Sequence, residues 1–274
     1  MMNLIKTEWL KMRSYRAFWW MTLVVALSYP GINWVFYAVY QDILGGKGTA
    51  SQLVKMLGNP FTFPEIWHTA AYFSSIFIFI PVIAVVMFIS NEFTYKTHRQ
   101  NIIDGWSRNQ FMFSKLIDVL FISLLVTLMY MVISLVIGYI NIDDKSGNIM
   151  DKSRYIFLFF LQTFSQLSIA FLIAFLTKKA FLALGIFFFY YIVELIGSAI
   201  MRNYQLDKLA EFLPLEISDM VVPVPTFLGT VRQQESPGWY DSMLAAVTPH
   251  VIYTLVLTTL VWALCFWINK KRDL

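Results

Sequence analysis

The chain has 274 residues, of which 58% are hydrophobic and only 14% are charged. Soluble domains carry roughly 25% charged residues, so this composition excludes an ordinary soluble protein and is typical of a membrane protein. The formal net charge is +4, but no basic patch interleaved with aromatic side chains lies in a polar domain, which argues against nucleic acid as a partner.

Six apolar runs are long enough to cross a bilayer, whose core requires about 20 residues of helix. A spanning strand would be about half as long and would alternate apolar with polar side chains, so these runs predict helices. We therefore expect a single all-α polytopic membrane domain. It covers residues 1–274, with transmembrane helices at residues 17–40, 67–90, 114–140, 155–177, 180–200 and 248–268.

The chain before the first span predicts a helix in the membrane interface over residues 1–16. Leu4, Ile5, Trp9 and Met12 fall at helical spacing, and cationic side chains occupy the rest of the helix surface. Such a helix lies in the interface plane with its Trp on the apolar side. An early start of the first span is the alternative interpretation.

Prolines mark the remaining irregular positions. Residues 201–247 hold four prolines among apolar patches, which predicts an outer-side segment of short helices that rest on or dip into the membrane. Pro30-Gly31 in the first span and Pro81 in the second predict kinks.

The distribution of Lys and Arg predicts the orientation. If both termini are cytoplasmic, 13 of the 21 Lys and Arg residues fall on the inner side, and most acidic residues fall on the other. Because short cytoplasmic loops carry an excess of Lys and Arg, we expect cytoplasmic termini.

Two helix-start signals occur in residues 97–115, between the second and third predicted spans. The sequences THRQ from Thr97 and SRNQ from Ser107 both fit the capping box. In that motif a hydroxyl accepts from the third backbone N–H, and the Gln side chain reaches back to the cap. A long helix should therefore begin near Arg108 and continue into the third span.

A separate short helix is expected over about residues 98–104, ended by Gly105 in a left-handed conformation. Seven residues span only about 10 Å of helix and are not stable alone in water. Ile102, Ile103 and Trp106 give the segment an apolar side. It must either fold back onto its own spans or dock into a soluble partner.

Together with the basic N-terminal segment and the tail from Lys270 to Leu274, this stretch resembles the membrane subunit of ABC type-2 exporters, and the resemblance covers the whole chain. That family has six spans, cytoplasmic termini and an N-terminal interfacial helix. Its pattern of T-x-R, then G-x-S-R, then K is matched here by Thr97, Arg99, Gly105, Ser107, Arg108 and Lys115.

In that family the loop between spans two and three is a coupling helix that sits in a cleft of the ATPase subunit. The resemblance implies that residues 97–107 play this role. The residues expected to contact the ATPase subunit are Thr97, Arg99, Gln100, Ile102, Ile103, Asp104, Gly105, Trp106, Ser107 and Arg108.

The resemblance also implies that ATP and Mg²⁺ bind a separate cytoplasmic ABC ATPase subunit, and that this chain needs no cofactor, metal or catalytic residue. A second permease copy, identical or related, and membrane lipid are the other expected partners, in the cell (inner) membrane. The run from Gly45 to Thr49 looks like a phosphate loop, but Gln41 stands where G-x-x-x-x-G-K needs glycine.

Three polar residues within predicted spans are candidates for a translocation path. Glu194 is the one acid well inside a span, and an intramembrane carboxyl is costly enough to indicate function by default. Gln162 and Gln166 lie on one face of the fourth span, together with Ser165. A packed carboxyl and interhelical hydrogen bonds explain these residues equally well, so the alternatives stay open.

The sequence favours the permease subunit of an ATP-driven ABC exporter. The alternative is a stand-alone secondary transporter or channel in which Glu194 couples to protons; discontinuous helices and internal repeats would favour it, and the sequence has no recognisable repeat. An intramembrane enzyme lacks any H-E-x-x-H or G-x-S-x-G constellation, and the single Cys265 excludes an internal disulfide.

Overall fold

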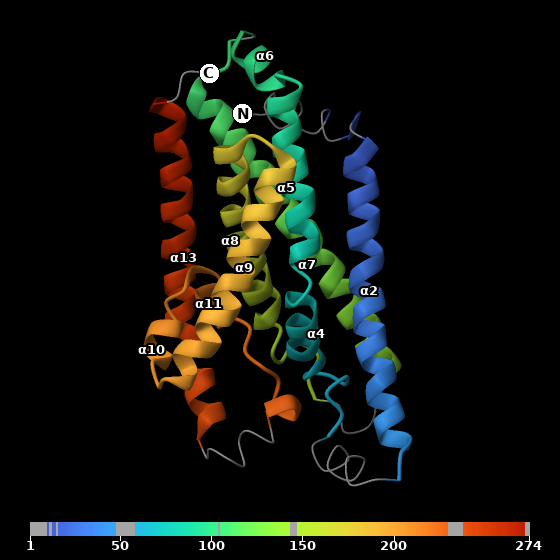
Figure 1. Ribbon diagram of the computed structural model, residues 1–274. Helices are drawn as coiled ribbons and strands as arrows, with labels where there is room; N and C mark the ends of the chain where they lie inside the picture. The colour runs from blue at the N-terminus through green and yellow to red at the C-terminus, as the bar shows by residue number, and fades with distance from the viewer. Residues whose placement is uncertain are drawn as a thin grey trace.

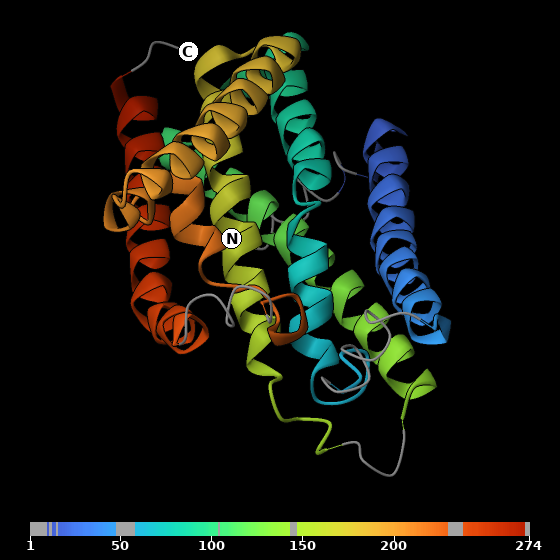
Figure 2. The same cartoon turned by 60° about the horizontal axis from the view of Figure 1, so that its bottom comes forward.

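In a computed structural model of the protein, every regular element among the described residues is a helix (Figure 1, Figure 2). The structure describes residues 10, 13–14, 16–47, 58–103, 105–142, 147–229 and 238–271. The predicted interfacial helix over residues 1–16 lies largely outside these residues.

Five helices among the described residues are long and apolar enough to cross a membrane. A further pair passes the same test together but is bent by 51° at a short break. The chain thus has the helices of a polytopic α-helical membrane protein, as predicted. The five are α2 (Arg16–Gly45), α7 (Arg108–Ile140), α8 (Arg154–Thr177), α9 (Ala180–Asn203) and α13 (Trp239–Lys271), and the bent pair is α4 (Ile66–Ser75) with α5 (Phe79–Thr94).

The break between α4 and α5 follows from Pro81, as expected. A proline has no N–H to bond the carbonyl four residues earlier, which here belongs to Phe77. That carbonyl accepts from the Ile80 N–H instead, at 3.0 Å, in a tighter turn. The other proline does not interrupt its helix, because α2 runs through Pro30 without a break.

Helix α8 forms the centre of the bundle, where it packs against α5, α7, α9 and α13 (Figure 2). Most of its apolar stretch is buried, whereas α2 and α9 turn large apolar side chains outward. In lipid, packing and interhelical hydrogen bonds hold helices together. One such bond runs from the Trp262 indole N–H to the Ser168 hydroxyl at 2.9 Å, and Phe171 stacks on the same indole ring.

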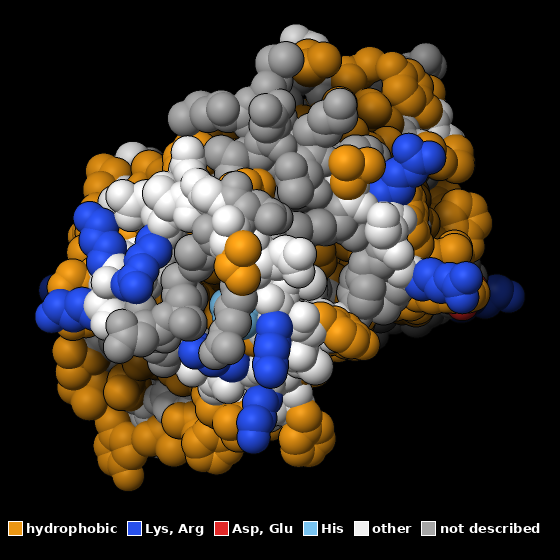
Figure 3. Space-filling view, turned by 90° about the horizontal axis from the view of Figure 1, so that it is seen from above, with side chains coloured by type: hydrophobic (Ala, Val, Ile, Leu, Met, Phe, Trp, Pro, Cys, Tyr) orange, Lys and Arg blue, Asp and Glu red, His pale blue; other side chains and the backbone are white. Residues whose placement is uncertain are grey.

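One end of the bundle is rich in Lys and Arg side chains (Figure 3). The short helix α6 (Thr97–Ile103) lies at one end, with the start of α2 and the end of α13 (Figure 1). Seen from that end, Lys and Arg side chains gather on the surface and Asp and Glu are almost absent (Figure 3). The opposite end carries the short helices α10 (Asp207–Ala210) and α11 (Pro214–Asp219).

The outer-side segment is shorter than predicted. Helix α9 continues to Asn203 and α13 already begins at Trp239, so the connection covers residues 204–238 in place of 201–247. Its short helices α10 and α11 match the expectation from its prolines and apolar patches. Helix α11 begins at Pro214, where the missing N–H of proline costs no helical hydrogen bond.

Candidate functional site

The polar segment between α5 and α7 forms a compact turn that we call the elbow (residues 95–107). It turns out of α5 at Lys96, whose φ is 57°, and leaves α6 at Gly105, whose φ is 91°. Ser107 then caps α7 as predicted: its hydroxyl accepts from the Gln110 N–H at 3.2 Å, and its own N–H donates to Gln110 Oε1 at 2.8 Å. The predicted terminator and the second capping box are confirmed.

The first predicted capping box is wrong. Thr97 is the first residue of α6, so its hydroxyl is not in a capping position and lies 3.5 Å from the carbonyl oxygen of Glu92 on α5. His98 makes the stronger tie, because its Nδ1 lies 3.1 Å from the same carbonyl and its ring packs on Phe93. The start of α6 is therefore fixed by α5, and the segment 97–107 expected to couple to a partner consists of α6 and the cap of α7, in line with the predicted short helix over about 98–104.

The predicted contact residues of the elbow differ in exposure. Ile103 is 83% exposed, although it is a large apolar side chain. Gln100, Gly105 and Ser107 are also exposed. Trp106 is half-buried, and its backbone N–H donates to the Asn101 carbonyl at 3.0 Å. Asp104 and the side chains of Arg99 and Ile102 lie outside the described residues.

Arg108 forms hydrogen bonds with α13. Its guanidinium donates to the Lys270 carbonyl at 2.8 Å, and its own carbonyl accepts from the Asn269 side chain at 2.7 Å. These two bonds join the start of α7 to the end of α13. The end of the elbow is thereby attached to a third helix, α13, besides α5 and α7.

A buried charged group lies directly beneath the elbow. The Lys115 ammonium, 1% exposed, donates to Glu92 on α5 at 2.7 Å and to Asp118 on α7 at 3.0 Å. The rings of Phe88 and Phe111 flank the ammonium at 5.3 and 5.5 Å, in the range of cation–π attraction. Glu92 therefore makes two contacts: its backbone carbonyl contacts His98 of α6, and its carboxylate pairs with Lys115 of α7.

Only Lys115 of this charged group was identified from the sequence, through the family pattern. A signal for the rest was available, since Lys115 and Asp118 are three residues apart at the start of a span and so share a helix face. Glu92 follows an apolar run on the preceding span. Charges at this depth are expensive unless they are paired.

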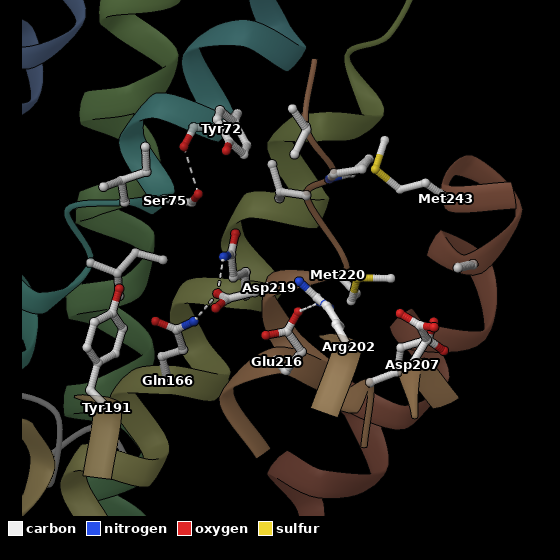
Figure 4. A pocket seen from close by; sticks show the side chains of 18 of the residues that line it. Tyr72, Ser75, Gln166, Tyr191, Arg202, Asp207, Glu216, Asp219, Met220 and Met243 are labelled. Carbon is white, nitrogen blue, oxygen red and sulfur yellow. Dashed lines mark hydrogen bonds and ion pairs between the residues drawn. The ribbon is translucent and has the colours of Figure 1, made fainter. Parts of the chain in front are cut away.

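A second candidate site lies toward the opposite end, where the break between α4 and α5 opens a cavity of about 620 Å³ (Figure 4). Tyr72 and Ser75 of α4 lie on one side of it, and Gln166 of α8 and Tyr191 of α9 on another. The connection between α9 and α13 and the first turns of α13 close the remaining sides. Pockets of this size hold small organic molecules in other proteins.

Asp219, at the end of α11, is the polar centre of the cavity. Its Oδ1 accepts from the side-chain amides of Gln162 at 2.9 Å and Gln166 at 2.6 Å. Burial raises the pKa of Asp219 to about 7, although the amide bonds from Gln162 and Gln166 oppose that shift. The two predicted glutamines do line the cavity, and their common partner is an acid that the sequence analysis missed.

Glu194 lies inside a span, α9, as predicted, and contacts the start of α11. Its Oε1 accepts from the backbone N–H groups of Leu215 at 2.6 Å and Glu216 at 2.8 Å, so the carboxylate caps the start of α11. It is not among the described residues that line the cavity. The geometry fits the structural alternative for this acid, as a buried carboxylate that holds α11 against α9.

Comparison with known families gives one match, over residues 53–274, to a family described as "Protein of unknown function (DUF2705)". The chain belongs to the DUF2705 family. No curated protein matches the chain. The matched range includes both the elbow and the cavity.

Replacement of Lys115 tests the buried charged group. Lys115→Met keeps the apolar stem but leaves two buried carboxylates without their shared cation. Removal of one partner from a buried ion pair costs about 3–5 kcal/mol, so we expect a markedly lower melting temperature in detergent, measured by fluorescence-detected size-exclusion chromatography.

Lys179→Met, the same change at an exposed lysine of the same end, should leave the melting temperature almost unchanged. The triple variant Glu92→Gln, Lys115→Met, Asp118→Asn removes all three charges and should recover much of the loss. A single variant as stable as the parent would show that the three charges do not interact.

Proposed function

We propose that the chain is the permease subunit of an ATP-driven exporter and that α6 couples it to a separate ATPase subunit. The observation that carries this proposal is the exposed Ile103 side chain on a short helix that is held firmly at both ends. The resemblance to ABC type-2 exporters supports the same assignment through the elbow sequence.

The short length and exposed apolar side chain of α6 favour contact with a protein partner. A helix of seven residues does not form alone in water, and here the contacts of His98 and the cap at Ser107 hold the elbow in place. These contacts are buried or polar, and none of them covers Ile103. A rigid apolar side chain at the tip of a charged surface is well suited as an anchor for a docking protein.

The same contacts provide a route for coupling. Movement of α6 would act directly on α5 through the Glu92 carbonyl, and on α7 through the Glu92 carboxylate and Lys115. ATP and Mg²⁺ would bind the partner subunit, and closure of its two copies would shift α5 and α7 in two copies of this chain. The path would then open alternately to the two sides of the membrane.

The proposed topology counts α4 and α5 as one broken span, which gives six spans. Both termini and the elbow are then cytoplasmic, in the cell (inner) membrane. The gathering of Lys and Arg at the α6 end supports this orientation (Figure 3).

Cysteine labelling tests this topology. In a Cys265→Ser background, Ser107→Cys in the elbow and Gln205→Cys before α10 should react with an impermeant maleimide from opposite sides of the membrane. Both positions are exposed. Labelling of both from one side would exclude the six-span arrangement.

Ile103→Asp tests the docking of α6. The change places a charge in the proposed contact, and burial of an unpaired charge costs several kcal/mol, enough to dissociate a modest interface. We expect tagged Ile103→Asp, purified from its native membrane, to lose the ATP hydrolysis that co-purifies with the parent chain.

Two controls accompany this variant. Ile103→Leu preserves the apolar contact and should retain the ATPase activity. Tyr204→Asp places the same charge on an exposed aromatic residue at the opposite end and should also retain it. The docking proposal fails if Ile103→Asp co-purifies as much ATPase activity as these two variants.

A stand-alone secondary transporter or channel remains the second candidate, and one observation favours it. Transporters of this class often bind their substrates at discontinuous helices, and the α4–α5 break lines a polar cavity here. In that case Glu194 would carry the coupling proton.

Proton flux distinguishes the two candidates. In proteoliposomes of the purified chain with an entrapped pH dye, we expect no more flux than in empty vesicles, because Glu194 is engaged in capping α11. A flux that Glu194→Gln abolishes, while the variant still assembles, would favour the secondary transporter.

A further inference from the structure

We propose that the cavity beside the α4–α5 break binds an organic cation with an apolar body, such as an amphiphilic ammonium or guanidinium compound. The site is separate from the exposed tip of α6, because α4, α10 and α11, which carry several of its lining residues, lie toward the opposite end of the bundle (Figure 1). Binding of the cation does not depend on the proposed function. A role of the bound cation as exported cargo would rest on the proposed function.

The charges around the cavity are predominantly negative. Asp207, Glu211, Glu216 and Asp219 contribute carboxylates, and Arg202 is the cation among the described lining residues. Arg202 is already engaged in an ion pair with Glu216. Asp207, Glu211 and Asp219 therefore add negative charge to a cavity whose one cation among the described lining residues, Arg202, is already paired with Glu216.

The two glutamines of α8 make the polar wall a set of acceptors. Both direct their amide N–H groups to Asp219, so their carbonyl oxygens point away from it. Gln162 is 1% exposed, and its Oε1 has no hydrogen-bond partner among the described residues. A buried acceptor without a donor is unfavourable, and this oxygen adds to the negative character of the cavity wall.

The rest of the wall is apolar and aromatic. It includes Ile78 in the helix break, Phe79 at the start of α5, Phe187 of α9, Met220 and Met243. Such side chains favour a hydrocarbon or aromatic body. The rings of Tyr72, Tyr191 and Trp239 also line the cavity, and aromatic faces attract organic cations.

The arrangement of the acids favours an organic cation over a metal ion. Metal sites in proteins need several ligands that converge on one point. The described residues contain no group of three or more His, Cys, Asp or Glu side chains that could hold a metal. The carboxylates instead border a space of about 620 Å³, which suits a charged head and an attached body.

Titration with matched probes tests the proposal. The full chain is reconstituted in nanodiscs of phosphatidylcholine and phosphatidylglycerol and titrated calorimetrically with 4-phenylbutylammonium, with empty nanodiscs as reference. We expect saturable binding of the ammonium, and binding at least about tenfold weaker for the neutral 4-phenylbutanol, which has the same shape. The anion 4-phenylbutyrate should not bind.

Substitutions then locate the site. Asp219→Asn should weaken the ammonium about tenfold, which corresponds to the loss of one charge-assisted contact. Should that variant fail to fold, the double variant Asp207→Asn, Glu211→Gln removes two peripheral charges and should weaken binding severalfold. Asp241→Asn, an exposed acid that does not line the cavity, is the control and should bind like the parent.

A lipid head group and a free amphiphile share the same ammonium chemistry, so the titration is repeated with phosphatidylethanolamine in the nanodisc. Competition by this lipid identifies a head group as the occupant, and unchanged affinity identifies a free amine. Equal binding of alcohol and ammonium overturns the proposal, as does parental affinity in both the Asp219→Asn and the double variant. Because the assay contains no ATPase, its outcome is separate from the test of α6 docking.

Discussion

The Lys115 ammonium, buried between Glu92 and Asp118, is the interaction on which the basic end of the molecule depends. A charge at this depth is tolerated only because two carboxylates and two aromatic rings surround it. The consequence is geometric, since α5 and α7 must keep the register that brings Glu92 and Lys115 together. The position of the elbow depends on this register, because His98 of α6 contacts the backbone carbonyl of the same Glu92.

At the opposite end, buried acids are also stabilised by specific partners, but these partners are N–H groups. Helix α11 has six residues, too few for stability alone, and it is held by acids that pair with backbone or amide N–H groups. Glu194 caps its start, and Asp219 at its end accepts from Gln162 and Gln166. A short helix is thus fixed across α8 and α9 by hydrogen bonds that water would weaken. The same fixation positions the carboxylate of Asp219 in the cavity.

Local signals in the sequence predicted the local structure well. A cap, a helix terminator and a helix break each act through the neighbouring backbone, so their effects could be inferred from a few residues. These are the cap formed by Ser107 and Gln110, the terminator Gly105 and the break at Pro81. Thr97 shows the limit of this reasoning. It fits the same capping pattern as Ser107, but a turn at Lys96 and the nearby carbonyl of Glu92 make it the first residue of α6 instead.

The groups that define the two sites depend on contacts between distant parts of the chain. Gln162 and Gln166 were recognised as a polar stripe, but their partner Asp219 follows 53 residues after Gln166 and sits on a short helix whose position no periodicity predicts. Likewise, the depth of Glu194 was evident, whereas its role required knowing that α11 begins beside it. Spans could be predicted from hydropathy because lipid imposes length and polarity on them. Cavities depend on which polar groups meet between spans.

Helix α5 connects the two sites. Its last turn carries Glu92, which supports α6 and pairs with Lys115, and its first turn follows the break that lines the cavity. On the other side of the break α4 is anchored, because its His68 lies 2.7 Å from the Pro223 carbonyl and stacks on Tyr155. Under the proposed function, a displacement of α6 by a partner would therefore move Ile78 and Phe79 relative to Tyr72 and Asp219. The cavity would change shape through a displacement of α5, without any rearrangement of α8.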